Sequence, residues 1–367
     1  MAIQFMNPSS LVFVVFLLSI MLVFLPTSCS AQSHNQTHVL PKECEADISD
    51  CNNKSAAFRL KIIAISSILV TSLIGVCLPL FSRFIPLLMP DRDLFVIVKA
   101  FASGIILATG FMHVLPDSFD MLRSVCLPHN PWHKFHFSGF LAMLSAVLAL
   151  MVDSLATSFC SWKRKNDYVI PKTESGDKEM GSIGGNVHAH GHCRHGVPQE
   201  GGSGDTLLLR YRVVAMVLEV GIVVHSVVIG LSLGATDNTC IIRPLVAALC
   251  FHQMFEGMGL GGCILQAEYK ILKKSVMVFF FSTTTPFGIV LGIVLSNVYK
   301  SNSPKSLITE GLLNASSAGL LIYMALVDLL AAEFMGAKLQ GSIKLQLKSY
   351  VAVLLGAGGM SLMAKWA

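Results

Sequence analysis

The fold is decided by residues 62–82, which read IIAISSILVTSLIGVCLPLFS, a run of 21 uncharged residues between Lys61 and Arg83. Residues 275–299 read SVMVFFFSTTTPFGIVLGIVLSNVY, a run of 25 uncharged residues. Apolar runs of about 18 residues or more are long enough to cross a lipid bilayer as helices. Both stretches therefore predict transmembrane helices.

The composition of the whole chain agrees with this interpretation. Of the 367 residues, 53% are hydrophobic and only 13% are charged, whereas a typical soluble domain has about 25% charged residues. Such a chain is neither a water-soluble globule nor a disordered, collagen-like or coiled-coil protein, and it is no basic nucleic-acid-binding module. We expect an all-α membrane protein whose surroundings are the lipid bilayer, with no nucleic-acid partner.

Long apolar runs recur along the chain, and the number of spans sets the topology. We expect eight transmembrane helices, at about 60–82, 94–116, 137–159, 213–235, 244–266, 276–298, 311–333 and 349–366. They fall into three segments, helices 1–3 within 60–159, helices 4–5 within 213–266 and helices 6–8 within 276–366. An even number puts both termini on one side. Since 16 of the 27 Lys and Arg lie on the side of the loop after the third helix, the positive-inside rule places the termini outside.

The amino terminus resembles a targeting segment. Leu11 to Leu25 is apolar, and small residues follow up to Ala31, so we predict a cleaved signal peptide over residues 1–31. The alternative is an uncleaved first helix, because no Lys or Arg precedes Lys42.

Residues 32–59 then form an extracellular segment with candidate modification sites. It contains glycosylation sequons at Asn35 and Asn53, and Cys44 and Cys51 are candidates to pair as a disulfide in an oxidising compartment. The alternative is that the sequons occur by chance and that both thiols are free.

The longest polar interruption, residues 160–212, predicts a flexible cytoplasmic loop. It carries nine of the 29 glycines and charges of both signs. Within it lie four of the twelve histidines and a cysteine, namely His188, His190, His192, Cys193 and His195. We expect this tract to bind zinc or a similar metal weakly. The alternative is a polar linker whose histidines have no role.

Several ionisable side chains lie inside the predicted spans. A charge at the bilayer centre costs roughly 2.5–3.5 kcal/mol even on the lenient scale, so each is a candidate functional residue. Apart from Lys99 they are acids and imidazoles: His113, Asp117, Asp153, Glu219, His225, His252, Glu256 and Asp328. Carboxylates and neutral imidazoles are ligands for divalent first-row metals.

Spacing groups some of these side chains. His113 and Asp117, and likewise His252 and Glu256, are four residues apart, so each pair shares one helix face. With His225 from a neighbouring span, the second pair makes a three-residue metal site. The alternative for a single pair is a buried, hydrogen-bonded histidine–carboxylate couple.

The motifs around these residues resemble the ZIP family of divalent metal transporters. They are HSVVIGLSLGA at 225–235, FHQMFEGMGLG at 251–261, HVLPDS at 113–118, MVDSLAT at 151–157 and IYMALVDLLAAE at 322–333. The resemblance covers nearly everything after residue 60, and it implies eight spans, outside termini and a histidine-bearing loop. Within the family, the chain is similar to plant iron-regulated transporters, which take up Fe²⁺ and also Zn²⁺, Mn²⁺, Co²⁺ and Cd²⁺ at the plasma membrane.

The resemblance also implies roles for individual residues. Family transport sites lie between the fourth and fifth spans, so it assigns His225, His252 and Glu256 as metal ligands, with Ser226 and Gln253 as neutral oxygen donors. Where members with two metals carry Glu ligands, this chain has Ile229 and Thr285, and we therefore predict one transport metal.

The resemblance also implies that further acids and a histidine lie along an access path. His113 and Asp117 lead outward, and Asp120 is a capture and selectivity residue. Asp153 and Asp328 are weaker candidates for the path.

These features together predict a multi-pass plasma-membrane transporter for divalent cations rather than an enzyme. No prosthetic group is expected, the metal ion is the substrate, and a homodimer is compatible with the sequence. One alternative is an intramembrane metalloenzyme, but the fifth span has His-x-x-x-Glu instead of the His-Glu-x-x-His of zinc proteases. The other is a metal-sensing receptor in which residues 186–196 are the working part.

Overall fold

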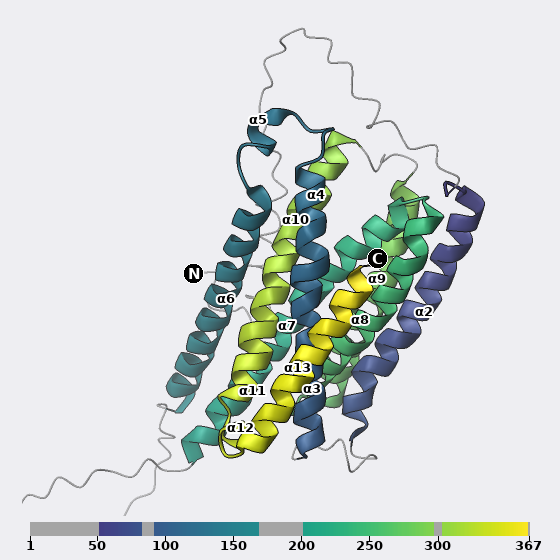
Figure 1. Ribbon diagram of the computed structural model, residues 1–367. Helices are drawn as coiled ribbons and strands as arrows, with labels where there is room; N and C mark the ends of the chain where they lie inside the picture. Colours follow the sequence, from purple (N-terminus) through teal and green to yellow (C-terminus); the bar gives the residue numbers. More distant parts are fainter. Residues whose placement is uncertain (1–50, 83–91, 169–200, 297–302, 366–367) are drawn as a thin grey trace, which may run out of the picture.

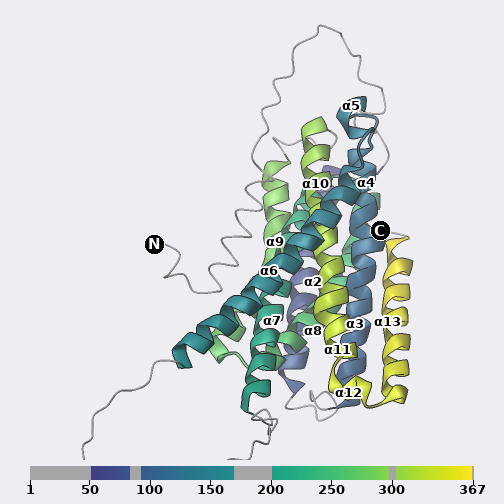
Figure 2. The same ribbon diagram turned by 90° about the vertical axis from the view of Figure 1, so that its left-hand side faces the viewer.

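The computed structural model describes residues 51–82, 92–168, 201–296 and 303–365, and in these ranges the chain is a bundle of long helices (Figures 1 and 2). The first half contains α2 (Lys54–Leu80), α3 (Asp93–Thr109), the π-helix η5 (Gly110–Val114), α4 (Leu115–Leu122), α5 (His129–Trp132) and α6 (Phe137–Tyr168). The second half contains α7 (Gly201–Ala235), α8 (Thr239–Gln266), α9 (Ile271–Leu295), α10 (Pro304–Tyr323), the π-helix η6 (Met324–Ala331), α11 (Ala332–Phe334), α12 (Ala337–Gln340) and α13 (Ile343–Ala364).

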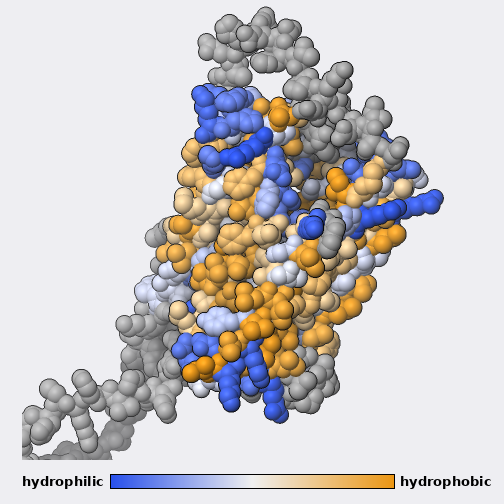
Figure 3. Space-filling model, viewed as in Figure 1, coloured by the Kyte–Doolittle hydropathy of each residue, from blue (hydrophilic) through white to orange (hydrophobic). Residues whose placement is uncertain are grey.

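Seven helical stretches in the described residues are long and apolar enough to cross a membrane. They are α2, the continuous stretch 93–122, α6, α7, α9, the continuous stretch 304–334, and α13. Large apolar side chains point away from the bundle on these helices, such as Leu354, Leu155 and Phe279, and apolar residues cover the middle of the molecule between two polar ends (Figure 3). An apolar outer surface of this extent suits contact with lipid.

The 28-residue helix α8 runs through the bundle beside these seven stretches, although it is not among them. Three buried polar side chains, His252, Gln253 and Glu256, lie on it. Its neighbours are helices α2, α3 and α7, so it lies inside the helical assembly.

The helices pack as two groups that meet at the middle of the bundle. In one group α8 runs along α2 and α9 runs along α7, and in the other α13 runs along α3 and α6 runs along α10. Contacts of α3 with α8, and of α10 with α7, join the groups. Side chains from different groups can therefore meet at one place.

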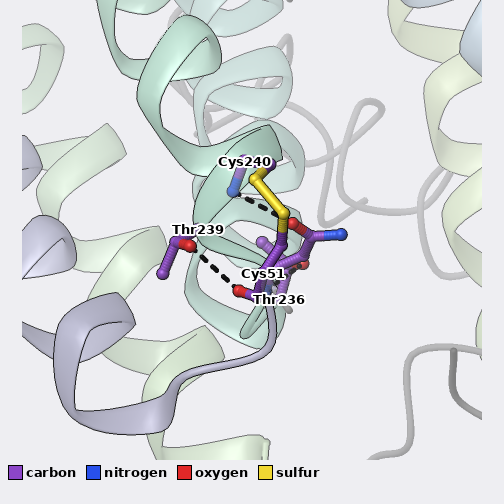
Figure 4. Close-up of a disulfide and its surroundings, with 5 residues drawn as sticks. Cys51, Thr236, Thr239 and Cys240 are labelled. Atoms are coloured by element: carbon purple, nitrogen blue, oxygen red, sulfur yellow. Dashed lines mark hydrogen bonds between the residues drawn. A yellow bond between two sulfur atoms is a disulfide. The ribbon is translucent and has the colours of Figure 1, made fainter. Parts of the chain in front are cut away.

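A disulfide fastens the start of α2 to the start of α8 (Figure 4). Cys51 is bonded to Cys240, and the carbonyl of Cys51 also accepts hydrogen bonds from the backbone N–H and the hydroxyl of Thr239, at 3.0 and 2.9 Å. Beside this link, Lys61 forms an ion pair of 3.1 Å with Asp237. Disulfides persist in oxidising compartments, so this is the end of the bundle that we expect outside the cytoplasm.

This disulfide corrects the expected pairing of Cys44 with Cys51. The partner of Cys51 is 189 residues away in the sequence, because the extended backbone at Asn52 pairs with Asn238 in an isolated β-bridge and brings the two cysteines together. Cys44 lies outside the described residues, as do Asn35 and the predicted signal peptide. Asn53 caps α2, and its side-chain oxygen accepts a 3.0 Å hydrogen bond from Ala56 N–H.

The predicted loop over residues 160–212 is helical at both ends. Helix α6 continues to Tyr168 and α7 begins at Gly201, because a helix, once started, gains a hydrogen bond with each added residue and needs no apolar period to continue. The histidine tract from His188 to His195 lies outside the described residues.

The packing of α2 on α8 predicts the effect of a single methyl group. A Cβ at Gly75 would lie 2.1 Å from the carbonyl oxygen of Met254, while a Cβ at Gly358 on α13 would meet nothing within 4 Å. Overpacking of this kind costs about 1–3 kcal/mol, whereas Gly→Ala in an open helix position gains up to about 1 kcal/mol. Gly75→Ala should therefore lower the melting temperature of the purified protein, and Gly358→Ala should leave it unchanged or raise it. Equal melting temperatures for the two variants would show that α2 and α8 do not pack this closely.

Candidate metal site

Two adjacent helices bring three possible metal ligands together inside the bundle. His225 comes from α7, and His252 and Glu256 come from α8. One ligand atom of each residue lies within 4.8 Å of the others, and all three side chains are at most 1% exposed. The described residues contain no second group of three or more His, Cys, Asp or Glu side chains with this geometry.

Local helix geometry explains why these residues meet. His252 and Glu256 are one turn apart on α8 and so share a face, and α7 packs beside α8. The imidazole rings of His225 and His252 have their centroids 5.7 Å apart. The predicted three-residue cluster is thus present as a compact group, although its role as a metal site stays a proposal.

The hydrogen bonding of His225 selects one of its ring nitrogens for a ligand. Its Nδ1 lies 3.0 Å from the hydroxyl oxygen of Ser317 on α10. With Nδ1–H donating to that oxygen, Nε2 keeps its lone pair, and Nε2 is buried with no hydrogen-bond partner in the described chain. Ligating histidines usually use their second nitrogen in this way.

The carboxylate of Glu256 gives the second argument for a cation. Both of its oxygens are buried, and neither has a hydrogen-bond partner among the described residues. A buried polar group without a partner costs about 1–3 kcal/mol, and more when it is charged. A divalent cation held by two imidazoles and a carboxylate would remove this cost, and that mixed donor set suits first-row divalent metals.

A second histidine–carboxylate pair leads from this cluster toward the disulfide end of the bundle. The ring of His113 has its centroid 6.4 Å from that of His252, and its Nδ1 lies 3.8 Å from a carboxylate oxygen of Asp117. Exposure rises along this line, from 5% at His113 to 39% at the Asp117 side chain, and Asp120 is exposed. The polar residues therefore form a graded series from the buried cluster to the outer surface.

The π-helix η5 contributes to this arrangement. It contains His113 and interrupts the regular helix between α3 and α4, and such single-turn π segments occur often at functional sites. Because the π turn changes the rotation per residue, it alters which face of the helix carries His113.

The neutral oxygens predicted near the site are also buried. The side chains of Ser226 and Gln253 are at most 1% exposed and have no hydrogen-bond partner among the described residues. Ile229 and Thr285 are buried as well, and the backbone of Thr285 lies against α7, because a Cβ at Gly230 would lie 2.6 Å from the Thr285 carbonyl oxygen. The positions expected for a second metal are therefore occupied by an alkyl group and a hydroxyl.

Asp153 and Asp328 lie apart from the path through His113 and Asp117. Asp153 on α6 accepts a 3.4 Å hydrogen bond from the hydroxyl of Tyr323. Asp328 is buried in η6, with Asp153 and Arg210 as charged neighbours. Since Arg210 precedes His225 by four turns of α7, these two acids are on the opposite side of the cluster, toward the end that we expect to face the cytoplasm.

The contacts of two further residues could not be predicted from the sequence. Ser317 is one of several small residues in α10, and nothing distinguishes it there from Ser316. Lys99, a base within α3, forms a buried ion pair with Glu333 of α11 and a 2.8 Å hydrogen bond to Gln266 of α8. Its partners are 234 and 167 residues away, so only the fold shows that Lys99 is a structural ion-pair residue.

Comparisons with known proteins identify the family of the chain. The sequence model of the ZIP zinc transporter family matches residues 58–364. The chain belongs to the ZIP family. It is therefore a multi-pass membrane protein of a transporter family, not an enzyme, and the resemblance found in its motifs is confirmed.

Individual relatives are plant proteins named for zinc or iron. The chain is 64% identical to a probable zinc transporter 10 of Arabidopsis thaliana, over 89% of this chain and 92% of the relative. It is 61% identical to Fe(2+) transport protein 1 of the same plant, over 90% and 92%. It is 54% identical to Fe(2+) transport protein 2 of Oryza sativa subsp. japonica, over 94% and 96%. These ZIP relatives support divalent metal ions as the substrate.

The contact between Ser317 and His225 predicts a difference between two neighbouring serines. Ser317→Ala removes the hydroxyl that orients His225, and loss of such a supporting partner typically lowers metal affinity about 10- to 100-fold. Ser316→Ala is the matched control, because the Ser316 hydroxyl bonds only to the carbonyl of Leu312 on its own helix, at 3.0 Å. Zinc binding to the purified variants, measured by calorimetry, checks this. Equal affinities in the two variants would contradict a role for Ser317.

Proposed function

We propose that this protein takes up divalent transition-metal cations across the plasma membrane into the cytoplasm. Fe²⁺ and Zn²⁺ are the main substrates, and Mn²⁺, Co²⁺ and Cd²⁺ are further ones. The observation that carries the proposal is the buried cluster of His225, His252 and Glu256, which offers two imidazoles and a carboxylate to one ion. The zinc and iron names of the relatives support the choice of metals.

The proposed topology has eight transmembrane helices, with α8 as the fifth. Seven stretches of the described residues meet the length and apolarity of a span, and α8 lies beside them within the bundle. The polar side chains His252, Gln253 and Glu256 of α8 do not contact lipid, because they are fully buried against the neighbouring helices. A cleaved signal peptide and an outside amino terminus complete this topology.

The proposed path uses the exposed and half-buried acids first. An ion meets Asp120, passes Asp117 and His113, and reaches His225, His252 and Glu256; Asp328 and Asp153 lie beyond, toward the cytoplasm. One metal binds at the central site, with Ser226 and Gln253 as additional oxygen donors. Nitrogen and oxygen ligands hold these ions less tightly than a set of thiolates would, so the ion can leave after the site opens to the other side.

Loss of the central ligands tests this proposal most simply. Replacing His225, His252 and Glu256 together by Ala should abolish uptake of radioactive iron or zinc in a transport-deficient cell, while surface abundance stays unchanged. The control is His136→Ala, because His136 is an exposed residue of the connection before α6. Normal uptake by the triple variant at normal abundance would overturn the assigned site.

Uptake should also fall in acid. Imidazole and carboxylate ligands must be deprotonated to bind a metal, so protons compete with the ion for His225, His252 and Glu256. The apparent KM for zinc should therefore rise as the external pH is lowered from about 7 to about 5. A KM that falls over this range would contradict binding by these ligands.

A metal-sensing receptor is the remaining alternative, and the cytoplasmic histidines distinguish it from a transporter. Deleting residues 186–196 should leave metal uptake in place, with altered regulation or selectivity, if the helices carry the function. A sensor would lose its output with the deletion. Measuring iron uptake in the presence of increasing zinc, manganese or cadmium would rank the substrates. The ligand types alone do not rank them, because mixed histidine–carboxylate sites follow the general affinity order of divalent metals.

A further inference from the structure

A second pair of histidines lies at the outer end of the molecule, away from the central cluster. His129 and His133 belong to the connection between α4 and α6, where helix α5 lies beyond the end of α4 (Figure 1). This is the polar end of the bundle (Figure 3) that also carries the link between Cys51 and Cys240. Cys126, three residues before His129, is disulfide-bonded too, which fits an oxidising compartment.

The two imidazoles are held side by side. Their centroids are 5.4 Å apart and their planes differ by only 14°. The backbone fixes this spacing, because the N–H of His133 donates a 3.0 Å hydrogen bond to the carbonyl of His129. Two imidazoles at this separation can direct one nitrogen each to a single ion with small side-chain rotations.

The segment that carries the pair is anchored to the start of α6. The ring of Trp132 packs on Phe137 at 4.9 Å, and Phe135 contacts Phe137 and Phe140 edge to face, at 4.7 and 5.4 Å. The carbonyl of Pro131 accepts hydrogen bonds of 3.1 Å from two following N–H groups. Because these contacts order the backbone, a metal bound here would lose little free energy to ordering of the chain.

Neither imidazole is engaged elsewhere. The described structure gives the side chains of His129 and His133 no hydrogen bond and no ion pair, and their ring contact is with each other. His129 is exposed and His133 is half-buried, so neither residue is enclosed by the bundle. The pair has the donors of a metal site and no structural partner that would account for them.

We propose that His129 and His133 form an outer two-imidazole site for a borderline divalent cation, with water as the remaining ligands. Imidazole suits Zn²⁺, Cu²⁺, Fe²⁺ and Ni²⁺. A two-residue site binds weakly and exchanges readily, which suits collection of ions ahead of Asp120 and Asp117. The capture role depends on the proposed transport function, but metal binding at the pair does not.

Trp132 provides a local reporter of binding. It is one of three tryptophans, and it lies between the two histidines in the sequence, so Trp162→Phe and Trp366→Phe make it the only tryptophan of the full-length protein. Cu²⁺ quenches nearby indole fluorescence. In the purified protein, Cu²⁺ should quench Trp132 saturably, and the additional change His129→Gln/His133→Gln should abolish that saturable quenching.

His136→Gln is the matched control, because His136 is an exposed histidine of the same connection but is not part of the stacked pair. It should leave the quenching curve unchanged. Unchanged quenching in the double variant would overturn the site, and so would equal loss in the His136 variant, which would indicate binding by the connection as a whole.

Uptake then tests the capture role separately. With both histidines replaced, the KM for zinc should rise several-fold while the maximal rate is unchanged, because the central cluster is intact. If the double variant lost copper binding but kept the KM for zinc, the pair would be a metal site without a role in capture. If the native protein transported no metal, the fluorescence assay would still decide whether the pair binds one.

Discussion

The burial of two imidazoles and a carboxylate in the middle of an apolar helix bundle is the constraint on which the structure depends. Removing such groups from water has a large free-energy cost unless they are paired, hydrogen-bonded or bound to a metal. Ser317 partners one nitrogen of His225, while both carboxylate oxygens of Glu256 have no hydrogen-bond partner in the described chain. Under the proposed function, a bound cation would offset this cost.

Other buried ionisable residues differ from this cluster because they have charged partners. Lys99 is paired with Glu333 and hydrogen-bonded to Gln266, and Lys61 is paired with Asp237. Lys99 of α3 contacts residues of α11 and α8, and Lys61 of α2 contacts the connection between α7 and α8, so each charge is satisfied by a residue far away in the sequence. The hydrogen bond of Lys99 to Gln266 links the two helix groups, and the unpaired cluster lies where the groups meet. The division between structural and ligand-binding residues thus follows from the partners of each group rather than from its burial.

Much of this arrangement could be predicted from the sequence, because it depends on local spacing. Apolar runs predicted where the long helices lie, although five of these helices begin five to seven residues before the predicted start. The four-residue spacing placed His252 and Glu256 on one face of α8. Other features depend on contacts between distant segments and could not be predicted. The pairing of Cys51 with Cys240 needs the bridge between Asn52 and Asn238, and Ser317 is identified only by its contact with His225. The last turns of α6 and the first turns of α7 were not predicted, because the sequence there has no apolar period.

The most direct test of the central claim is X-ray absorption spectroscopy of zinc bound to the purified protein. The protein used should lack residues 186–196 and carry His129→Gln/His133→Gln, so that the central cluster is the remaining proposed zinc site. We predict about two imidazole nitrogens and additional oxygen ligands around the zinc, with no sulfur. The histidine signal should disappear when His225 and His252 are replaced. A sulfur-ligated zinc, or an unchanged histidine signal in that variant, would contradict the central claim.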